Sequence, residues 1–247
     1  PEDATHGLPV LMGVKGAEIG TLLQLGVEAI EREFASHGSS KDQQNLRQIL
    51  AGTYVDDAGY CRTLEELMAH PHAKMAKLER QHVLALRLYT TDSYSRVNDP
   101  LRQDPPERPH PFAATTYFIS EGIKMLRAVA ASLPDAHTLR VYWRGMKDLG
   151  LTMEFMEKGG TEFACMSTSA SQDVAVHFAP LGAAADLQVR DQGLHLARRR
   201  HLLPLGAQSP PGSPPRPCSS PARVCRFGFV QVFPGEKEAL YPPLTYL

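Results

Sequence analysis

The sequence lacks any long hydrophobic run. No stretch of about eighteen uncharged apolar residues, the length that a transmembrane helix needs, occurs in the 247 residues. The amino terminus also lacks the basic region and following apolar region that mark a signal peptide. We therefore expect neither a transmembrane segment nor a signal peptide, which leaves the compartment open, with the cytoplasm favoured. Because the chain begins with Pro1 instead of methionine, we expect a fragment or a processed product.

Cysteine is scarce and shows no metal-binding spacing. The four residues, none of which forms a CxxC pair, are Cys61, Cys165, Cys218 and Cys225. This spacing favours reduced thiols over a disulfide framework or a zinc site. Among the ten histidines the only close pair is His70 and His72, and the proline between them keeps the two side chains off a shared helical face. We expect both to lie on the surface, and we expect no metal centre.

A large excess of charge of one sign is also missing. Lys and Arg total 26 and Asp and Glu total 27, which argues against a protein that coats nucleic acid or an anionic membrane. The balance is uneven along the chain, because residues 181–226 contain seven arginines, two aspartates and neither lysine nor glutamate. Seven of the 20 prolines lie between Pro204 and Pro221. This composition predicts a disordered basic loop, and arginines 198–200 without interleaved aromatics are weak evidence for RNA binding.

Apolar periodicity predicts a helical first half. Apolar residues recur at helical spacing in three segments, 17–36, 73–88 and 115–132. Thr63 followed by Glu66 has the pattern of a helix-capping box. The polar and proline-containing stretch 90–100 predicts turn and loop.

The second half of the sequence is typical of β-structure. Strand-like alternation or β-forming residues occur in three segments, 138–143, 162–167 and 227–233. Polar residues 169–173 predict the cap of a short helix over 174–178. Helices first and strands afterwards predict the α+β fold class.

Three short polar elements lie at the ends of these predicted strands. Arg144 with Gly145 suits a phosphate or carboxylate ligand, and the hydroxyl residues 167–169 either cap a helix or orient another polar side chain. On an extended chain Glu236 and Glu238 face one side, which is unfavourable unless a cation or a donor-rich ligand lies between them. Taken one at a time, each element also has an ordinary explanation as a surface arginine, a helix cap or a solvated charge cluster.

Taken in order, the Arg-Gly, Ser-Thr-Ser and Glu-x-Glu elements resemble the mono-ADP-ribosyltransferases of the Arg-Ser-Glu class, which are arginine-specific and use NAD. The longer motifs that resemble this family are 86–102 (with Tyr89, Tyr94, Asn98 and Arg102), 141–145, 163–179 and 233–245. The resemblance covers about residues 64–179 and 227–247. It implies a helical N-terminal half followed by a β-rich NAD-binding core.

The resemblance also implies the reaction, in which ADP-ribose is transferred from NAD to an arginine side chain of a protein acceptor and nicotinamide is released. NAD is then a co-substrate, and the scheme uses no metal. The residues implied in NAD binding are Arg144, Gly145, Ser167, Thr168, Ser169 and Glu238.

Four of these positions carry the implied catalytic roles. Glu238 would bind a ribose hydroxyl and stabilise an oxocarbenium-like transition state, and Ser167 would hold Glu238 in place. Arg144 would contact the NAD phosphates, a bidentate task that suits a guanidinium. Glu236 would bind and activate the arginine of the acceptor.

The sequence departs from the family pattern over residues 181–226, where two further strands are expected. Arginine without lysine, with dense proline and alanine, resembles translated GC-rich non-coding sequence, which gives the hypothesis of a gene-model artefact. The family also continues into a final strand beyond the equivalent of residue 247, so we expect the β-rich core to be incomplete.

We therefore expect an N-terminal helical extension, 1–62, and a transferase-like domain, 63–247, that is interrupted by 181–226. Two alternatives stay open. The chain is a catalytically inactive relative that serves as an interaction module, or it is a helical scaffold whose basic loop binds an acidic partner.

Overall fold

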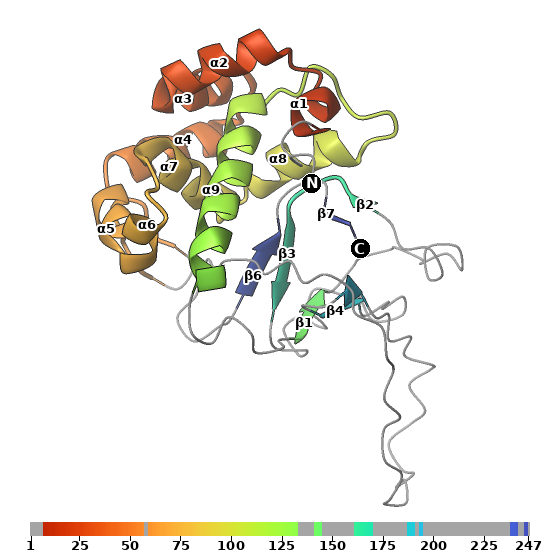
Figure 1. Ribbon diagram of the computed structural model, residues 1–247. Coiled ribbons are helices and arrows are strands. Elements are labelled where there is room, and N and C mark those ends of the chain that lie inside the picture. The colour runs from red at the N-terminus through yellow and green to blue at the C-terminus, as the bar shows by residue number, and fades with distance from the viewer. Residues whose placement is uncertain are drawn as a thin grey trace, which may run out of the picture. The chain divides into compact units, whose positions relative to one another are not determined.

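The computed structural model describes residues 7–56, 59–132, 141–144, 161–169, 187–190, 193–194, 238–241 and 245–246. The described residues up to Ser132 are mostly helical (Figure 1). Their helices are α1 (Gly7–Met12), α2 (Gly16–Leu25), α3 (Val27–His37), α4 (Ser40–Leu50), α5 (Leu64–Ala69), α6 (Pro71–Met75), α7 (Arg80–Tyr89), α8 (Tyr94–Arg102) and α9 (Ala113–Ser132). The predicted helical half is confirmed. Among these helices, none combines the length and the hydropathy that crossing a bilayer requires.

The described residues after Ser132 form short strands. These are β1 (Val141–Arg144), β2 (Thr161–Glu162), β3 (Met166–Ser169), β4 (Leu187–Arg190), β5 (Gly193–Leu194), β6 (Glu238–Tyr241) and β7 (Thr245–Tyr246). Strands of two to four residues supply few ladder hydrogen bonds each, so most of the packing of the described chain comes from the helices.

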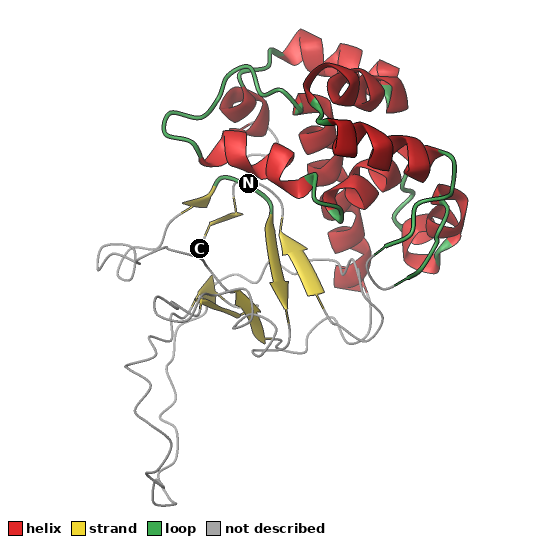
Figure 2. Ribbon diagram, turned by 180° about the vertical axis from the view of Figure 1, so that it is seen from behind, coloured by secondary structure: helices red, strands yellow, loops and turns green. Residues whose placement is uncertain are grey.

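The chain divides into two compact units. Unit 1 consists of Pro1–His137, Gly160–Ser167 and Arg226–Leu247, and unit 2 consists of Thr138–Gly159 and Thr168–Cys225. In unit 1, β2 pairs antiparallel with β7. Strand β3, whose first two residues belong to this unit, neighbours β6, and the two strands lie side by side in both views (Figures 1 and 2). In unit 2, β1 pairs antiparallel with β4, β4 pairs with β5, and Trp143 of β1 lies opposite Ser169 at the end of β3.

The predicted helix over 17–36 is two helices, α2 and α3, because Gly26 interrupts it. Gly26 has φ 55° and ψ −117°, a conformation that glycine alone adopts without strain. Its N–H still donates to the Leu22 carbonyl at 3.0 Å, so the first helix closes normally before the chain turns. Apolar periodicity continues across Gly26, because both helices contribute to one core. The periodicity therefore did not indicate that a helix ends at this glycine.

The predicted helix over 73–88 is also divided, into α6 and α7. Lys77 has φ 54°, and the N–H groups of Lys77 and Leu78 donate to the carbonyls of Lys74 and Ala73, both at 3.0 Å. These two bonds form a Schellman motif, which ends a helix through one left-handed residue. Glycine usually occupies that position, so the lysine gave no sequence signal for the stop.

The prediction of turn and loop over 90–100 is wrong, because α8 begins at Tyr94 and contains Pro100. Burial of Val97 and Leu101, which are 1% and 0% exposed, outweighs the unfavourable composition of this segment. Another helix that apolar periodicity did not indicate, α4, begins at a capping box in which Ser39 accepts from the Asp42 N–H at 3.2 Å. The predicted capping box at Thr63 is confirmed, with Thr63 N–H donating to Glu66 at 2.8 Å.

The core of unit 1 joins helices from both sides of residue 62. Buried side chains of α3 and α4, including Ile30, Phe34 and Leu46, belong to the same cluster as Leu84 of α7 and Phe118 of α9. The α9 helix packs most extensively against α7, and the two lie side by side in both views (Figures 1 and 2). The proposed extension 1–62 therefore shares its core with the residues that follow it.

Several sequence predictions for the second half need correction or fall outside the described residues. The predicted strand 162–167 is interrupted at 163–165 and becomes β2 and β3. The segment 181–226 contains β4 and β5, where short alternation is enough once a partner strand supplies ladder bonds. The rest of that segment, the predicted strand 227–233 and the predicted helix 174–178 lie outside the described residues.

Candidate functional site

Ser167 and Glu238, two of the predicted catalytic residues, lie on neighbouring strands of unit 1. Ser167 is the second residue of β3 and is exposed, whereas Thr168 and Ser169 after it are 4% and 5% exposed. Glu238 is the first residue of β6, the neighbour of β3 (Figure 1). Ser167 and Glu238 therefore belong to neighbouring strands.

The remaining predicted site residues are Arg144, Gly145 and Glu236. Arg144 is the last residue of β1 in unit 2, where its partner in register is Leu187. Gly145 and Glu236 lie outside the described residues. Their roles, and that of Arg144 toward NAD, stay predictions.

The segment between β2 and β3 is held by side chains of two helices. The Cys165 N–H donates to Asn98 Oδ1 at 3.1 Å, and the Tyr89 hydroxyl donates to the Cys165 carbonyl at 3.2 Å. Asn98 Nδ2 donates in turn to Tyr89 Oη at 3.0 Å, which closes a ring of three hydrogen bonds. We call Tyr89, Asn98 and the Cys165 peptide groups the Cys165 clasp. It attaches β3 to α7 and α8 two residues before Ser167.

An ion pair secures the same segment on its outer side. Arg102 of α8 donates from Nε and Nη2 to the two carboxylate oxygens of Glu162 at 3.2 and 3.3 Å. Glu162 also accepts from the Ala164 N–H at 3.0 Å, so the carboxylate joins the helix to the turn that leads into β3. A bidentate guanidinium–carboxylate pair fixes relative orientation as well as distance.

The residues of the Cys165 clasp are buried, so leaving any of their polar groups without a hydrogen bond would cost free energy. Cys165 is 0% exposed, Asn98 2% and Tyr89 7%. Burial raises the pKa of the Cys165 thiol, so this sulfur is a neutral core group and a poor nucleophile. Cys61 is the other free cysteine of the described residues, and it is exposed. These two agree with the expectation of reduced thiols, and Cys218 and Cys225 lie outside the described residues.

The clasp joins two of the motifs that carry the family resemblance. Tyr89, Asn98 and Arg102 belong to the motif 86–102, and Cys165 belongs to the motif 163–179. Sequence reasoning gave these residues no role, because Tyr89 and Asn98 contact a segment more than 60 residues away. A usable signal was present, since a buried asparagine on the apolar side of a helix needs a hydrogen-bond partner.

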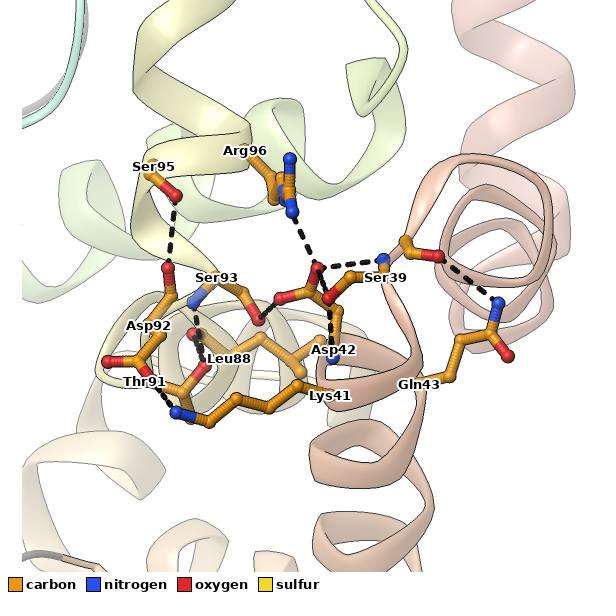
Figure 3. Close-up of polar contacts among 11 residues, drawn as sticks. Ser39, Lys41, Asp42, Gln43, Leu88, Thr91, Asp92, Ser93, Ser95 and Arg96 are labelled. Atoms are coloured by element: carbon orange, nitrogen blue, oxygen red, sulfur yellow. Dashed lines mark hydrogen bonds and ion pairs between the residues drawn. The ribbon is translucent and has the colours of Figure 1, made fainter.

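A second polar cluster surrounds Asp42 at the start of α4 (Figure 3). Its carboxylate accepts from the hydroxyls of Ser39 and Ser93 at 2.6 and 2.7 Å and from Arg96 Nε at 3.1 Å. Burial acts to raise the pKa of Asp42, but the hydrogen bonds from Ser39, Ser93 and Arg96 together hold it below its usual value. Lys41 binds Asp92 beside the cluster. Every oxygen of Asp42 is engaged, so this cluster fixes α4 to the start of α8 and offers no ligand site.

Arg87 carries a buried charge in α7. Its Nη2 lies 3.5 Å from Asp56 Oδ2, both side chains are 7% exposed, and the guanidinium carbon lies 5.0 Å from the centroid of the Tyr54 ring. Within the described part of the chain its Nε has no hydrogen-bond partner. The carboxylate and the ring compensate the charge, which makes the group a structural pair.

An open hollow of 370 Å³ lies between α6 and the end of α9. Its lining consists of Met75, Ala76, Met125, Ala128, Val129 and Ser132. A dinucleotide carries a pyrophosphate that requires cations or backbone N–H groups, and this lining has no charged side chain. The hollow therefore does not fit NAD.

Comparison with known proteins adds no family assignment: models of protein families, curated proteins and solved structures all fail to match the chain. The resemblance to the ADP-ribosyltransferases consequently rests on the motifs alone. Across the described ranges no group of three or more His, Cys, Asp or Glu side chains could hold a metal ion.

Proposed function

We propose that this protein transfers ADP-ribose from NAD to an arginine side chain of a protein acceptor and releases nicotinamide. The β-rich NAD-binding core of an ADP-ribosyltransferase is part of the same proposal. The observation that carries it is the neighbourhood of β3 and β6, which supports joint action of Ser167 and Glu238. Two polar motifs with some 70 residues between them thus lie on adjacent strands, which joint action requires.

The proposed chemistry assigns a task to each carboxylate. The bond between the nicotinamide nitrogen and the ribose carbon breaks, and positive charge develops on the ribose ring. Glu238 stabilises that charge through the electrostatic field of a carboxylate held close to the ring, and Ser167 fixes the orientation of Glu238. A guanidinium nitrogen of the acceptor then bonds to the same carbon, and Glu236 accepts the proton that this nitrogen releases. Arg144 binds the pyrophosphate.

The first test is incubation of the chain with labelled NAD and an arginine-rich acceptor protein. We expect the label to enter the acceptor, and we expect Glu238→Ala to reduce labelling by at least about 100-fold, the usual order for losing a charge-stabilising group in the transition state. Glu107→Ala is the control, because Glu107 is an exposed glutamate outside the four motifs, and it should label normally.

The outcomes separate the open alternatives. Labelling that survives Glu238→Ala contradicts the catalytic role of Glu238. A folded wild-type chain that neither labels the acceptor nor releases nicotinamide supports the inactive interaction module instead. Glu236→Ala distinguishes transfer from hydrolysis, since it should abolish acceptor labelling while nicotinamide release continues.

A further inference from the structure

We propose that Tyr89 and Asn98 are positioning residues that set the place of Ser167 beside β6 through the Cys165 clasp. The inference rests on the proposed function, because it concerns the same serine and the same strand. It assigns a role to two buried polar side chains that the reaction itself does not require.

The backbone at Cys165 needs these side chains because the strand ladder is interrupted there. Residues 163–165 separate β2 from β3, and Ala164 and Cys165 in this segment are buried, so their peptide groups lack the neighbours that a continuous strand would provide. A buried N–H or carbonyl without a partner is costly. Asn98 binds the Cys165 N–H, and Tyr89 binds the Cys165 carbonyl, which also accepts from Arg102 Nη2 at 3.5 Å.

The hydrogen bonds of the clasp have a fixed direction. Asn98 Oδ1 must accept, because it faces the Cys165 N–H, and this leaves Asn98 Nδ2 to donate to the Tyr89 oxygen. The hydroxyl of Tyr89 in turn donates to the Cys165 carbonyl. Reversing any one bond would leave two donors or two acceptors in contact, so the ring specifies a single arrangement of the turn.

The position of the clasp explains why it acts on Ser167. Cys165 lies two residues before Ser167, a distance of about 7 Å along an extended chain. Met166 between them is 0% exposed and is packed, so the backbone has little freedom between the clasp and the serine. A shift of this segment is therefore transmitted to Ser167 on β3, the neighbour of β6.

The test compares two variants. Asn98→Leu removes both hydrogen bonds of the amide, and Tyr89→Phe removes the hydrogen bonds of the hydroxyl while keeping the ring. Ser93→Ala is the matched control: it also removes a buried side-chain hydrogen bond, from Ser93 to Asp42, but it does not touch Cys165. Two readouts are measured on the full chain. One is the rate at which a maleimide labels Cys165, followed by mass spectrometry of its peptide, and the other is kcat and KM for NAD.

We expect Asn98→Leu to accelerate labelling of Cys165 at least about tenfold, because the turn opens more often. We expect its kcat to fall about 10-fold to 100-fold with KM for NAD changed less than about twofold, since a misplaced group weakens the transition state more than substrate binding. Tyr89→Phe should show smaller effects in the same direction and remain folded, and the control should match wild type in both readouts.

Failure of this inference is distinguishable from failure of the proposed function. If wild type is active and both variants keep the kcat of the control, the positioning role is overturned whether or not Cys165 becomes reactive. If wild type neither cleaves NAD nor labels an acceptor, the proposed function is overturned and the positioning role with it. A fall in kcat that the Ser93→Ala control reproduces would indicate a general loss of stability and would also overturn the positioning role.

Discussion

Glu33 illustrates how burial and hydrogen bonding oppose each other at a single carboxyl group. It belongs to α3, and it accepts from the N–H groups of Ala114 and Thr115 at 2.5 and 3.0 Å and from the Thr115 hydroxyl at 2.7 Å. Glu33 thereby caps the first turn of α9 from another helix. Burial nevertheless outweighs these bonds and raises its pKa to about 7.

A raised pKa means that the folded state binds the Glu33 proton more tightly than the unfolded state does. The associated stability is complete below pH 4.5 and is lost as the pH rises to about 7. Glu33→Gln carries no such proton. As the pH rises from 4.5 to about 7, the free energy of unfolding of the wild type should therefore fall by about 2–3 kcal/mol relative to that of the variant. Urea unfolding of both proteins across that range measures the difference.

The variant must be compared with wild type, because His110 changes the free energy of unfolding with pH in the direction opposite to Glu33. Burial lowers the pKa of His110 to about 4, and its ring nitrogens contact the Phe112 N–H and the Val97 carbonyl, so stability linked to His110 is lost on acidification. Glu31→Gln, at an exposed glutamate of the same helix, is the control and should show the wild-type pH dependence. A difference in free energy of unfolding between Glu33→Gln and wild type that does not change with pH would contradict the raised pKa of Glu33.

At the scale of elements, Gly20 and Gly26 of the α2 region predict opposite effects of the same substitution. Gly26 ends α2 at φ 55°, so Gly26→Ala should lower the free energy of unfolding by about 1–2 kcal/mol through backbone strain. Gly20 lies inside α2 and an added Cβ would meet no atom within 4 Å, so Gly20→Ala should raise it by about 0.5–1 kcal/mol. Thermal or urea unfolding measures both, and equal effects of the two variants would refute the two-helix arrangement.

The elements that the sequence failed to predict share a physical cause. Helix α9 was predicted because its apolar residues repeat over several turns, and the Thr63 cap was predicted because its hydrogen bonds are local. Helix α8 was missed because its stability comes from burying Val97 and Leu101 against other helices, which local composition does not encode. The end of α6 was missed because glycine usually marks the left-handed residue that ends a helix, and here that residue is Lys77.

At the scale of the whole molecule, the helices before and after residue 62 share one core, so we expect them to unfold as one unit. Ile30 of α3 is 0% exposed and belongs to the cluster that contains Phe118 of α9. Ile30→Ala should therefore cost about 3 kcal/mol and lower the midpoint of a single cooperative transition. Leu23→Ala, at a leucine that is 45% exposed on α2, should cost less than about 1 kcal/mol.

Calorimetry together with a tryptophan-independent probe such as far-ultraviolet circular dichroism tests this prediction. Coincident transitions in both variants indicate one cooperative unit. An early, separate transition in Ile30→Ala would indicate that residues 1–62 unfold independently of the helices that follow.

The sequence by itself determined the helical character of the first half, the cap at Thr63 and the set of motifs that suggests an ADP-ribosyltransferase. These features depend on periodicity and on residue types at short range, which a linear chain displays directly. Only the tertiary structure decided that α3, α4, α7 and α9 share one core, that β3 lies beside β6, and that Tyr89 and Asn98 bind the turn before Ser167. Each of these is a contact between residues distant in sequence, and such contacts form because buried apolar surface and buried peptide groups must find partners wherever the chain can supply them.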